Sequence, residues 1–192
     1  MSVYILVFII VIFLYIFIFV NRKNIVLIES KSGTKLYVYN DSTKKEKTKL
    51  LGDIIQNLFI LKNHMVENIN KFPEYKVYIK QLEKNLDDTN TTINETDPNS
   101  DLTSYSVNKG EELSFCLKSK KTGKIHDINL MMYVAIHELA HIANPEIGHG
   151  ELFKKIFRKL LEEAVKLNIY RLDNYAADPV EYCGMILSST IL

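Results

Sequence analysis

Two histidines and a glutamate form the most chemically informative segment of this chain of 192 residues. His137, Glu138 and His141 make up an HExxH motif, and the motif lies in an apolar stretch, residues 130–143, that favours a helix. Residues four apart share one face of a helix, so both imidazoles can reach a single metal ion. Glu138 can then face a water molecule at that metal, which is how a zinc-dependent peptidase places its general base.

A catalytic zinc ion needs a third protein ligand and one open position. We favour His149, which follows the second motif histidine after a segment that contains Pro145 and Gly148, residue types that can reverse the chain. The alternative is a carboxylate farther along, as in thermolysin-like enzymes. The candidates for that alternative are Glu162 and Glu163, with Glu151 as a weaker one.

The predicted roles follow from the chemistry of these groups. Neutral imidazoles of His137, His141 and His149 bind Zn²⁺, and Glu138 takes a proton from water and delivers it to the leaving amine. Zinc peptidases often add a donor for the developing oxyanion, frequently a tyrosine or histidine. We predict Tyr182 for this part. The other candidates are Tyr170 and Tyr175.

The motif followed by Gly148, His149 and Phe153 resembles the pattern of the WLM and SprT-like metallopeptidases. Residues 104–186 are also similar to small membrane-anchored WLM-related proteins of large DNA viruses, and the tail around residues 179–185 is part of that likeness. The resemblance implies a zincin-like α+β fold, bound zinc and a polypeptide substrate. This chain departs from the WLM pattern in placing seven residues between the second and third histidines, a longer spacing than usual.

The N-terminus carries an uninterrupted apolar and aromatic run, residues 3–20. Such a run is about long enough to cross a bilayer core, and it lacks the basic start and small-residue cleavage site of a signal peptide. We therefore predict a transmembrane anchor over residues 1–23. Arg22 and Lys23 follow the run, so the positive-inside tendency predicts a C-terminal domain in the cytosol or virion interior.

Between the anchor and the motif, hydrophobic periodicity predicts alternating strands and helices in two parts. Residues 24–101 should form a hairpin, two helices and a polar loop, and residues 102–192 the zinc metallopeptidase core with a small antiparallel sheet. Residues 113–117 are the candidate edge strand for a peptide substrate. The expected segments are strands at 25–28, 35–39, 104–107 and 113–117, a charged linker at 41–49, helices at 50–69, 73–86 and 152–165, a polar loop at 87–101, and Asp127 or Asn129 as the cap of the motif helix.

Charge and cysteine content narrow the function further. The chain has 24 basic and 23 acidic side chains, so its net charge of +1 indicates no nucleic-acid site, although cellular relatives of the resembled family cleave proteins crosslinked to DNA. Cys116 and Cys183 lie in apolar sequence and are predicted to be buried free thiols, with a single disulfide as the alternative.

The function predicted from these features is a membrane-anchored zinc metallopeptidase. A non-catalytic membrane or virion structural protein is the alternative, in which zinc only stabilises the fold and Cys183 supplies a fourth ligand. A zinc amidase or another zinc hydrolase is a third possibility, because the motif alone does not define the substrate.

Overall fold

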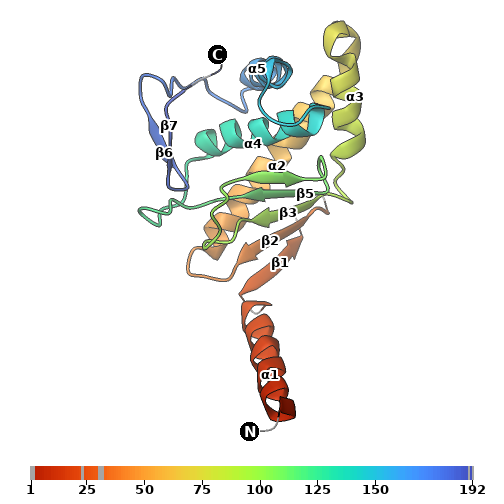
Figure 1. Ribbon diagram of the computed structural model, residues 1–192. Helices are drawn as coiled ribbons and strands as arrows, with labels where there is room; N and C mark the ends of the chain where they lie inside the picture. The colour runs from red at the N-terminus through yellow and green to blue at the C-terminus, as the bar shows by residue number, and fades with distance from the viewer. Residues whose placement is uncertain (1–2, 23, 30–32, 190, 192) are drawn as a thin grey trace.

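A mixed β-sheet and a layer of helices build the body of the protein in the computed structural model, which describes residues 3–22, 24–29, 33–189 and 191 (Figure 1). The sheet has five strands in the order β1-β2-β3-β5-β4. Its strands are β1 (Ile25–Glu29), β2 (Lys35–Tyr39), β3 (Thr92–Glu95), β4 (Tyr105–Val107) and β5 (Glu112–Phe115). The predicted α+β class is therefore confirmed.

The sheet is mixed, which corrects the prediction of a small antiparallel one. The β1–β2 and β4–β5 pairs are antiparallel, whereas β3 runs parallel to both β2 and β5. Parallel neighbours need a long crossover, and α2 (Lys44–Glu67) and α3 (Lys76–Asn85) supply it between β2 and β3. Strands from both predicted parts of the chain thus pair within one sheet.

Two strand predictions are wrong in detail. The predicted polar loop at residues 87–101 contains β3, whose Ile93 is fully buried in the centre of the sheet. The predicted edge strand at residues 113–117 contains β5, which lies between β3 and β4. The edge nearest the motif helix is β4 instead.

The predicted charged linker at residues 41–49 is mostly helix, because α2 already begins at Lys44. A buried ion pair explains this start: the Lys47 Nζ lies 2.7 Å from an oxygen of Glu95, and the lysine side chain is fully buried. Pairing offsets the cost of removing both charges from water. Lys47 therefore joins the first turns of α2 to the last residue of β3.

The motif helix α4 (Ile128–Ala143) lies in the middle of the helical layer, against α2, α3 and α5 (Glu151–Lys166) (Figure 1). It begins at Ile128, and of the two predicted cap residues Asp127 is the N-cap: its carboxylate accepts a 2.8 Å hydrogen bond from the backbone N–H of Asn129, the other candidate. It ends at Ala143, just before Asn144 and Pro145. Most of its side chains are buried, so the motif stands on a rigid element.

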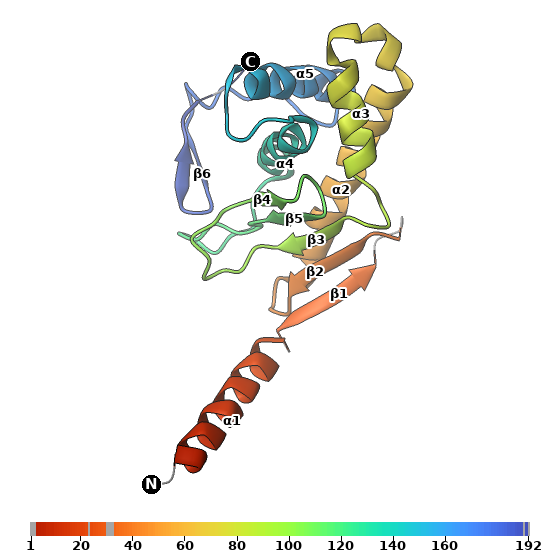
Figure 2. The same cartoon turned by 45° about the vertical axis from the view of Figure 1, so that its right-hand side comes forward.

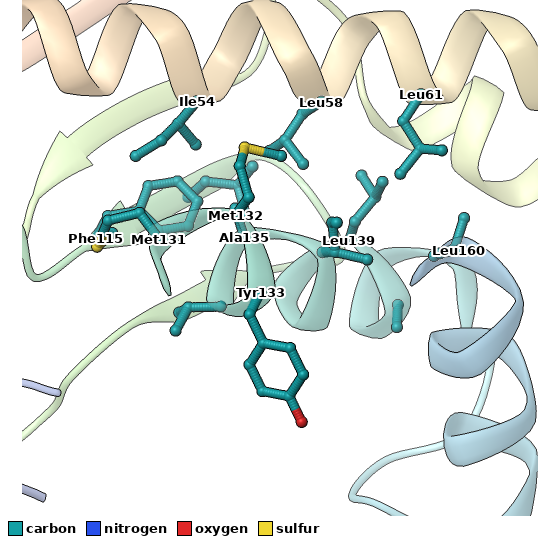
Figure 3. Close-up of a cluster of buried hydrophobic side chains, with 14 of the residues drawn as sticks. Ile54, Leu58, Leu61, Phe115, Met131, Met132, Tyr133, Ala135, Leu139 and Leu160 are labelled. Atoms are coloured by element: carbon teal, nitrogen blue, oxygen red, sulfur yellow. The ribbon is translucent and has the colours of Figure 1, made fainter. Parts of the chain in front are cut away.

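Aliphatic side chains fix α4 against α2. Figure 3 shows Leu58 and Leu61 of α2 facing Met132, Ala135 and Leu139 of α4, and all five side chains are fully buried. Each large one stabilises the fold by about 1.5–3 kcal/mol relative to an exposed position. The small Ala135 lets the two helices approach closely.

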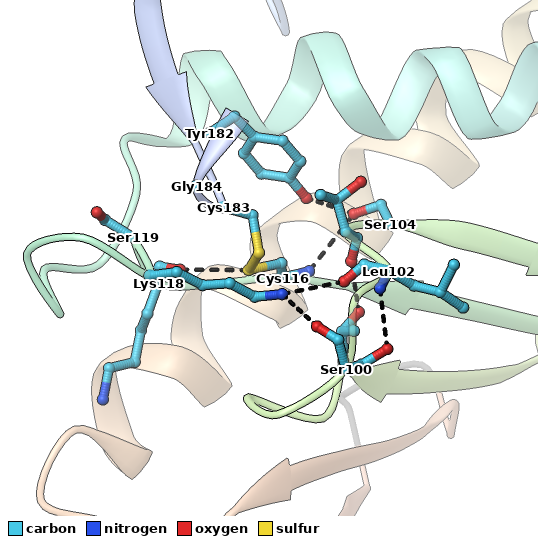
Figure 4. Close-up of a disulfide and its surroundings, with 12 residues drawn as sticks. Ser100, Leu102, Ser104, Cys116, Lys118, Ser119, Tyr182, Cys183 and Gly184 are labelled. Atoms are coloured by element: carbon cyan, nitrogen blue, oxygen red, sulfur yellow. Dashed lines mark hydrogen bonds between the residues drawn. A yellow bond between two sulfur atoms is a disulfide. The ribbon is translucent and has the colours of Figure 1, made fainter. Parts of the chain in front are cut away.

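The cysteines form a disulfide, which corrects the prediction of free thiols. Cys116, directly after β5, is bonded to Cys183 in the turn between β6 (Val180–Tyr182) and β7 (Met185–Leu187) (Figure 4). The two residues are 67 positions apart, so the sequence alone does not indicate that they lie close together. The disulfide ties the C-terminal hairpin to the central sheet, on the side that faces α4.

Helix α1 (Val3–Arg22) projects away from the sheet and exposes its apolar side chains (Figures 1 and 2). No helix in the described part of the chain combines the length and hydropathy that crossing a bilayer requires. This finding overturns the predicted anchor at residues 1–23, the membrane contact through residues 3–20, and the single-pass localisation with a cytosolic or virion-interior domain.

Candidate metal centre

Three imidazoles converge at the C-terminal half of α4. His137 and His141 lie one helical turn apart, and His149 reaches them from the segment between α4 and α5. The Nε2 atoms are 3.2 Å apart for His137 and His141, and each lies 3.0 Å from the Nε2 of His149. Ligands of tetrahedral zinc with bonds of 2.0–2.1 Å are about 3.3 Å apart. The triangle of nitrogens therefore fits a single zinc ion.

A phenylalanine forms the base of this triangle. The ring centroid of Phe153 lies 4.3 Å from that of His141 and 4.8 Å from those of His137 and His149. Phe153 is itself buried, in the first turn of α5. Its packing fixes the orientation of all three imidazoles, which gives a structural reason for the early phenylalanine in the resembled pattern.

Lys109 holds the segment that carries His149, and it is a residue that the sequence did not single out. Its Nζ donates hydrogen bonds to three backbone oxygens, those of His141 (3.2 Å), Asn144 (2.7 Å) and Glu146 (2.9 Å). One ammonium group thus satisfies carbonyls at the end of α4 and in the following turn. No sequence signal points to Lys109, because its partners lie more than thirty residues away.

We expect Lys109→Met to weaken zinc binding about tenfold, because supports of metal ligands are typically worth 10–100-fold in affinity. The measurement is competition with a chromogenic chelator, read beside the thermal midpoint of unfolding. Lys109→Arg retains N–H donors and should recover part of the affinity. A methionine variant that binds zinc as tightly as the parent would show that Lys109 contributes to folding alone.

Burial sets the protonation of the motif side chains. Desolvation, followed by the neighbouring histidines, lowers the pKa of His137 to about 3. Desolvation and the nearby His149 and Lys109 lower the pKa of His141 to about 4. Both imidazoles are therefore neutral at pH 7 and offer lone pairs to a metal. Burial raises the pKa of Glu138 to about 7 in the metal-free protein, and a nearby cation would lower it again.

The imidazoles and Glu138 open onto a cavity of about 640 Å³. Its lining comes from β4 with the residues before it, from the β6–β7 hairpin and from the turn that bears His149. Apolar side chains of Val134, Ile147, Met185 and Leu187 line it beside the polar motif. A few polar groups in a largely apolar cleft are typical of a substrate site.

Of the three tyrosines proposed from the sequence, the fold brings only Tyr182 to this cavity, whose lining also includes Tyr105 and Tyr133. The Tyr182 side chain is buried, and its hydroxyl shares a short hydrogen bond with the Ser104 hydroxyl (Figure 4). Burial raises the pKa of Tyr182, so the phenol keeps its proton. The other two candidates, Tyr170 and Tyr175, pack around Tyr133 and are absent from the cavity lining.

The carboxylates considered as alternative third ligands lie elsewhere. Glu163 is buried and binds the side chains of His64, Lys159 and Lys166. Glu162 and Glu151 each pair with a lysine on their own helix. Cys183, the possible fourth ligand of a structural zinc site, has its sulfur in the disulfide. Of all these candidates, the structure brings only His149 to the motif.

Comparison with known proteins places the chain among virus-encoded relatives. No protein family model matches it. It is 48% identical over 155 residues to the uncharacterized protein R325 of Acanthamoeba polyphaga mimivirus, covering 81% of this chain and 78% of R325. The chain belongs to the R325 family. A second relative of this R325-family chain is the uncharacterized protein 136R of Invertebrate iridescent virus 6, 24% identical over 170 residues, or 77% of this chain and 92% of 136R.

The fold of this R325-family chain is similar to that in the crystal structure of Wss1 from Saccharomyces cerevisiae. The TM-score is 0.51 at 17% sequence identity, and the match covers 68% of this chain and 87% of Wss1. At this identity the likeness establishes the fold alone. It agrees with the α+β fold that the motif resemblance implied.

Proposed function

We propose that this protein is a zinc-dependent peptidase of the WLM type. The observation that carries the proposal is the convergence of three Nε2 atoms within 3.2 Å of one another, with the buried Glu138 on the same helix turn and a cavity in front of them. The similarity to Wss1, a WLM-domain metallopeptidase, supports the same assignment at the level of the fold.

The residues have distinct roles in this proposal. His137, His141 and His149 would hold the metal ion through neutral imidazoles. When bound, zinc would supply a Lewis acid and lower the pKa of a water molecule to about 7. Glu138 accepts the proton of the attacking water and delivers it to the amine that leaves. Glu138 is buried, so solvent would only weakly screen its electrostatic interaction with a bound metal ion.

The substrate chain would bind along β4. This strand pairs with β5 on one side only, and its other side has no strand partner in the described chain. An extended polypeptide can add to such an edge through main-chain hydrogen bonds. Residues 103–106 line the cavity, so a peptide on this edge passes directly over Glu138 and the histidines.

Tyr182 is proposed as the donor to the developing oxyanion. We expect Tyr182→Phe to lower kcat about 10- to 100-fold with little change in KM, because the lost hydrogen bond forms mainly in the transition state. Zinc content should remain at the parent level. Cleavage kinetics with a fluorogenic peptide measure both constants, and a kcat equal to that of the parent would remove Tyr182 from the mechanism.

A purely structural zinc site is the weaker alternative. It would need a fourth protein ligand, and the sulfur of Cys183 is unavailable because it is bonded to Cys116. A metal ion held by the three histidines alone would instead keep one coordination position for water, on the side of the adjoining cavity. Three ligands and an open position are the arrangement of catalytic zinc.

Metal removal tests the proposed function directly. The full-length protein, incubated with unfolded casein, should produce new α-amino groups, lose this activity after treatment with a chelator, and regain it with one equivalent of zinc. Peptide-bond hydrolysis is distinguished from side-chain amidase activity by the fragments in a mass spectrum. Cleavage that survives complete metal removal, or release of ammonia without fragments, would contradict the assignment.

A further inference from the structure

Helix α2 packs against one face of the sheet (Figure 2). A second cavity lies on the opposite face. It has a volume of about 400 Å³ and is lined by side chains from all five strands, and we call it the tyrosine groove. Its lining consists of Ile25, Tyr37, Tyr39, Thr92, Asn94, Glu95, Asp97, Tyr105 and Ser114.

Strand register explains why this face is hollow. Tyr105 lies opposite Ser114, Ser114 opposite Asn94, and Asn94 opposite Tyr37 in successive strand pairs. The row therefore has small polar side chains in the middle and an aromatic ring at each end. Alternation within each strand sends the neighbouring residues, such as Ile93 and Leu113, into the core on the opposite face.

The chemistry of the groove favours a cationic ligand. Its charged lining residues are both acidic, and Glu95 is already paired with the buried Lys47. Asp97 is exposed and sits beside the Tyr39 ring, where burial, then this carboxylate, raise the pKa of Tyr39 to about 12, so the phenol is neutral. Aromatic faces next to a carboxylate attract an ammonium or guanidinium group. Lys47 Nζ lies 6.0 Å from the centre of the Tyr39 ring but is paired with Glu95 and Asp41, and no lysine or arginine is among the lining residues.

The tyrosine groove and the metal cleft meet at β4. Tyr105 lines both cavities. In a peptide added to the free edge of β4, successive side chains would point to opposite faces of the sheet. One set would face α4 and Glu138, and the alternate set would lie over Tyr105 and the tyrosine groove. A long cationic side chain in the second set can reach toward Asp97.

We infer that the tyrosine groove binds an arginine or lysine side chain of the same polypeptide whose backbone lies on β4. This inference rests on the proposed peptidase function. It gives the enzyme a preference for substrates with a cationic residue at one fixed position from the scissile bond, on the face opposite the metal.

Paired peptides test the inference. Zinc-loaded, full-length Glu138→Gln protein is titrated with fluorescein-labelled ten-residue peptides that carry arginine, or its neutral isostere citrulline, at each position in turn. We expect about tenfold tighter binding of arginine at one position, the combined size of a cation–π contact and an exposed ion pair. Asp97→Asn should reduce this preference to within twofold. Asp101→Asn, an exposed carboxylate of the same loop outside the groove, should leave it intact.

A second measurement does not depend on the metal cleft. Nα-acetyl-arginine methylamide should shift the NMR signals of the Tyr37 and Tyr105 rings in protein with ring-labelled tyrosines. The Tyr37→Phe and Tyr105→Phe variants assign these signals. The citrulline analogue should not shift them. Equal affinity for arginine and citrulline peptides at every position, or tyrosine signals that respond equally to both analogues, would overturn the inference. Arginine selectivity in a protein that cleaves no peptide would instead refute the proposed function and leave the groove as a cation site.

Discussion

Replacing Glu138 by glutamine is expected to lower peptide-bond cleavage by about a thousandfold or more while zinc remains bound. Glutamine keeps the size of the side chain but cannot take a proton from water, and general-base catalysis contributes about 10²- to 10⁴-fold. Glu138 is not one of the three converging imidazoles, so metal content should stay at one ion per chain. The measurement is the initial rate of casein cleavage beside zinc content by atomic absorption.

A matched control accompanies this variant. Glu162→Gln changes an α5 carboxylate that pairs with Lys159, and it should cleave at the rate of the parent. This control also tests the alternative in which a carboxylate on the second helix binds the metal. A Glu138→Gln protein that cleaves as fast as the parent would refute the proposed mechanism.

Replacing His149 by alanine should weaken zinc binding at least a hundredfold. Only two imidazoles of α4 would then remain, and the described cluster of potential ligands contains no carboxylate. Glu151 and Glu163 each pair with a lysine instead. Loss of a direct ligand should exceed the 10- to 100-fold typical of supporting residues. The measurement is competition with a chelator of known affinity.

His64→Ala is the control for this second variant. His64 lies on α2 and contacts Glu163, so its removal should change zinc affinity by less than twofold. Unchanged zinc binding in His149→Ala would show that the third ligand is another residue. A loss of zinc in both variants would indicate unfolding, which circular dichroism distinguishes.

Local sequence signals predicted the elements that carry the motif. The apolar run and the Asp127 cap fix α4, and the break at Asn144 and Pro145 ends it where the chain must turn. The hairpin of β1 and β2 also follows from its alternating residues. These features depend on neighbours in sequence, so periodicity and turn chemistry suffice to find them.

Features that depend on partners distant in the sequence could not be predicted from the sequence alone. Strand β3 has only one buried aliphatic residue, Ile93, and becomes a strand because β2 and β5 pair with both of its edges. The sequence at the start of α2 is typical of a charged linker, and only the tertiary ion pair between Lys47 and Glu95 accounts for its place in the fold. The cysteine pair spans 67 positions. In each case the decisive contact is tertiary and overrides local propensity.

The same distinction applies to the candidate site. Spacing alone brought His137 and His141 together, and the turn residues before His149 made it the favoured third candidate. Nothing local indicated that Lys109 would bind three carbonyls around that turn, or that Ser104 would meet the hydroxyl of Tyr182. Supporting contacts of this kind arise from the packing of β4 against the end of α4.

Anomalous X-ray diffraction from zinc-loaded crystals of the full-length protein tests the central claim most directly. We predict one zinc peak per chain, about 2.0–2.1 Å from the Nε2 atoms of His137, His141 and His149, with no fourth protein ligand and with Glu138 facing the open position. A zinc ion held by other residues, a fourth protein ligand that closes the site, or no peak at the three histidines would contradict the account.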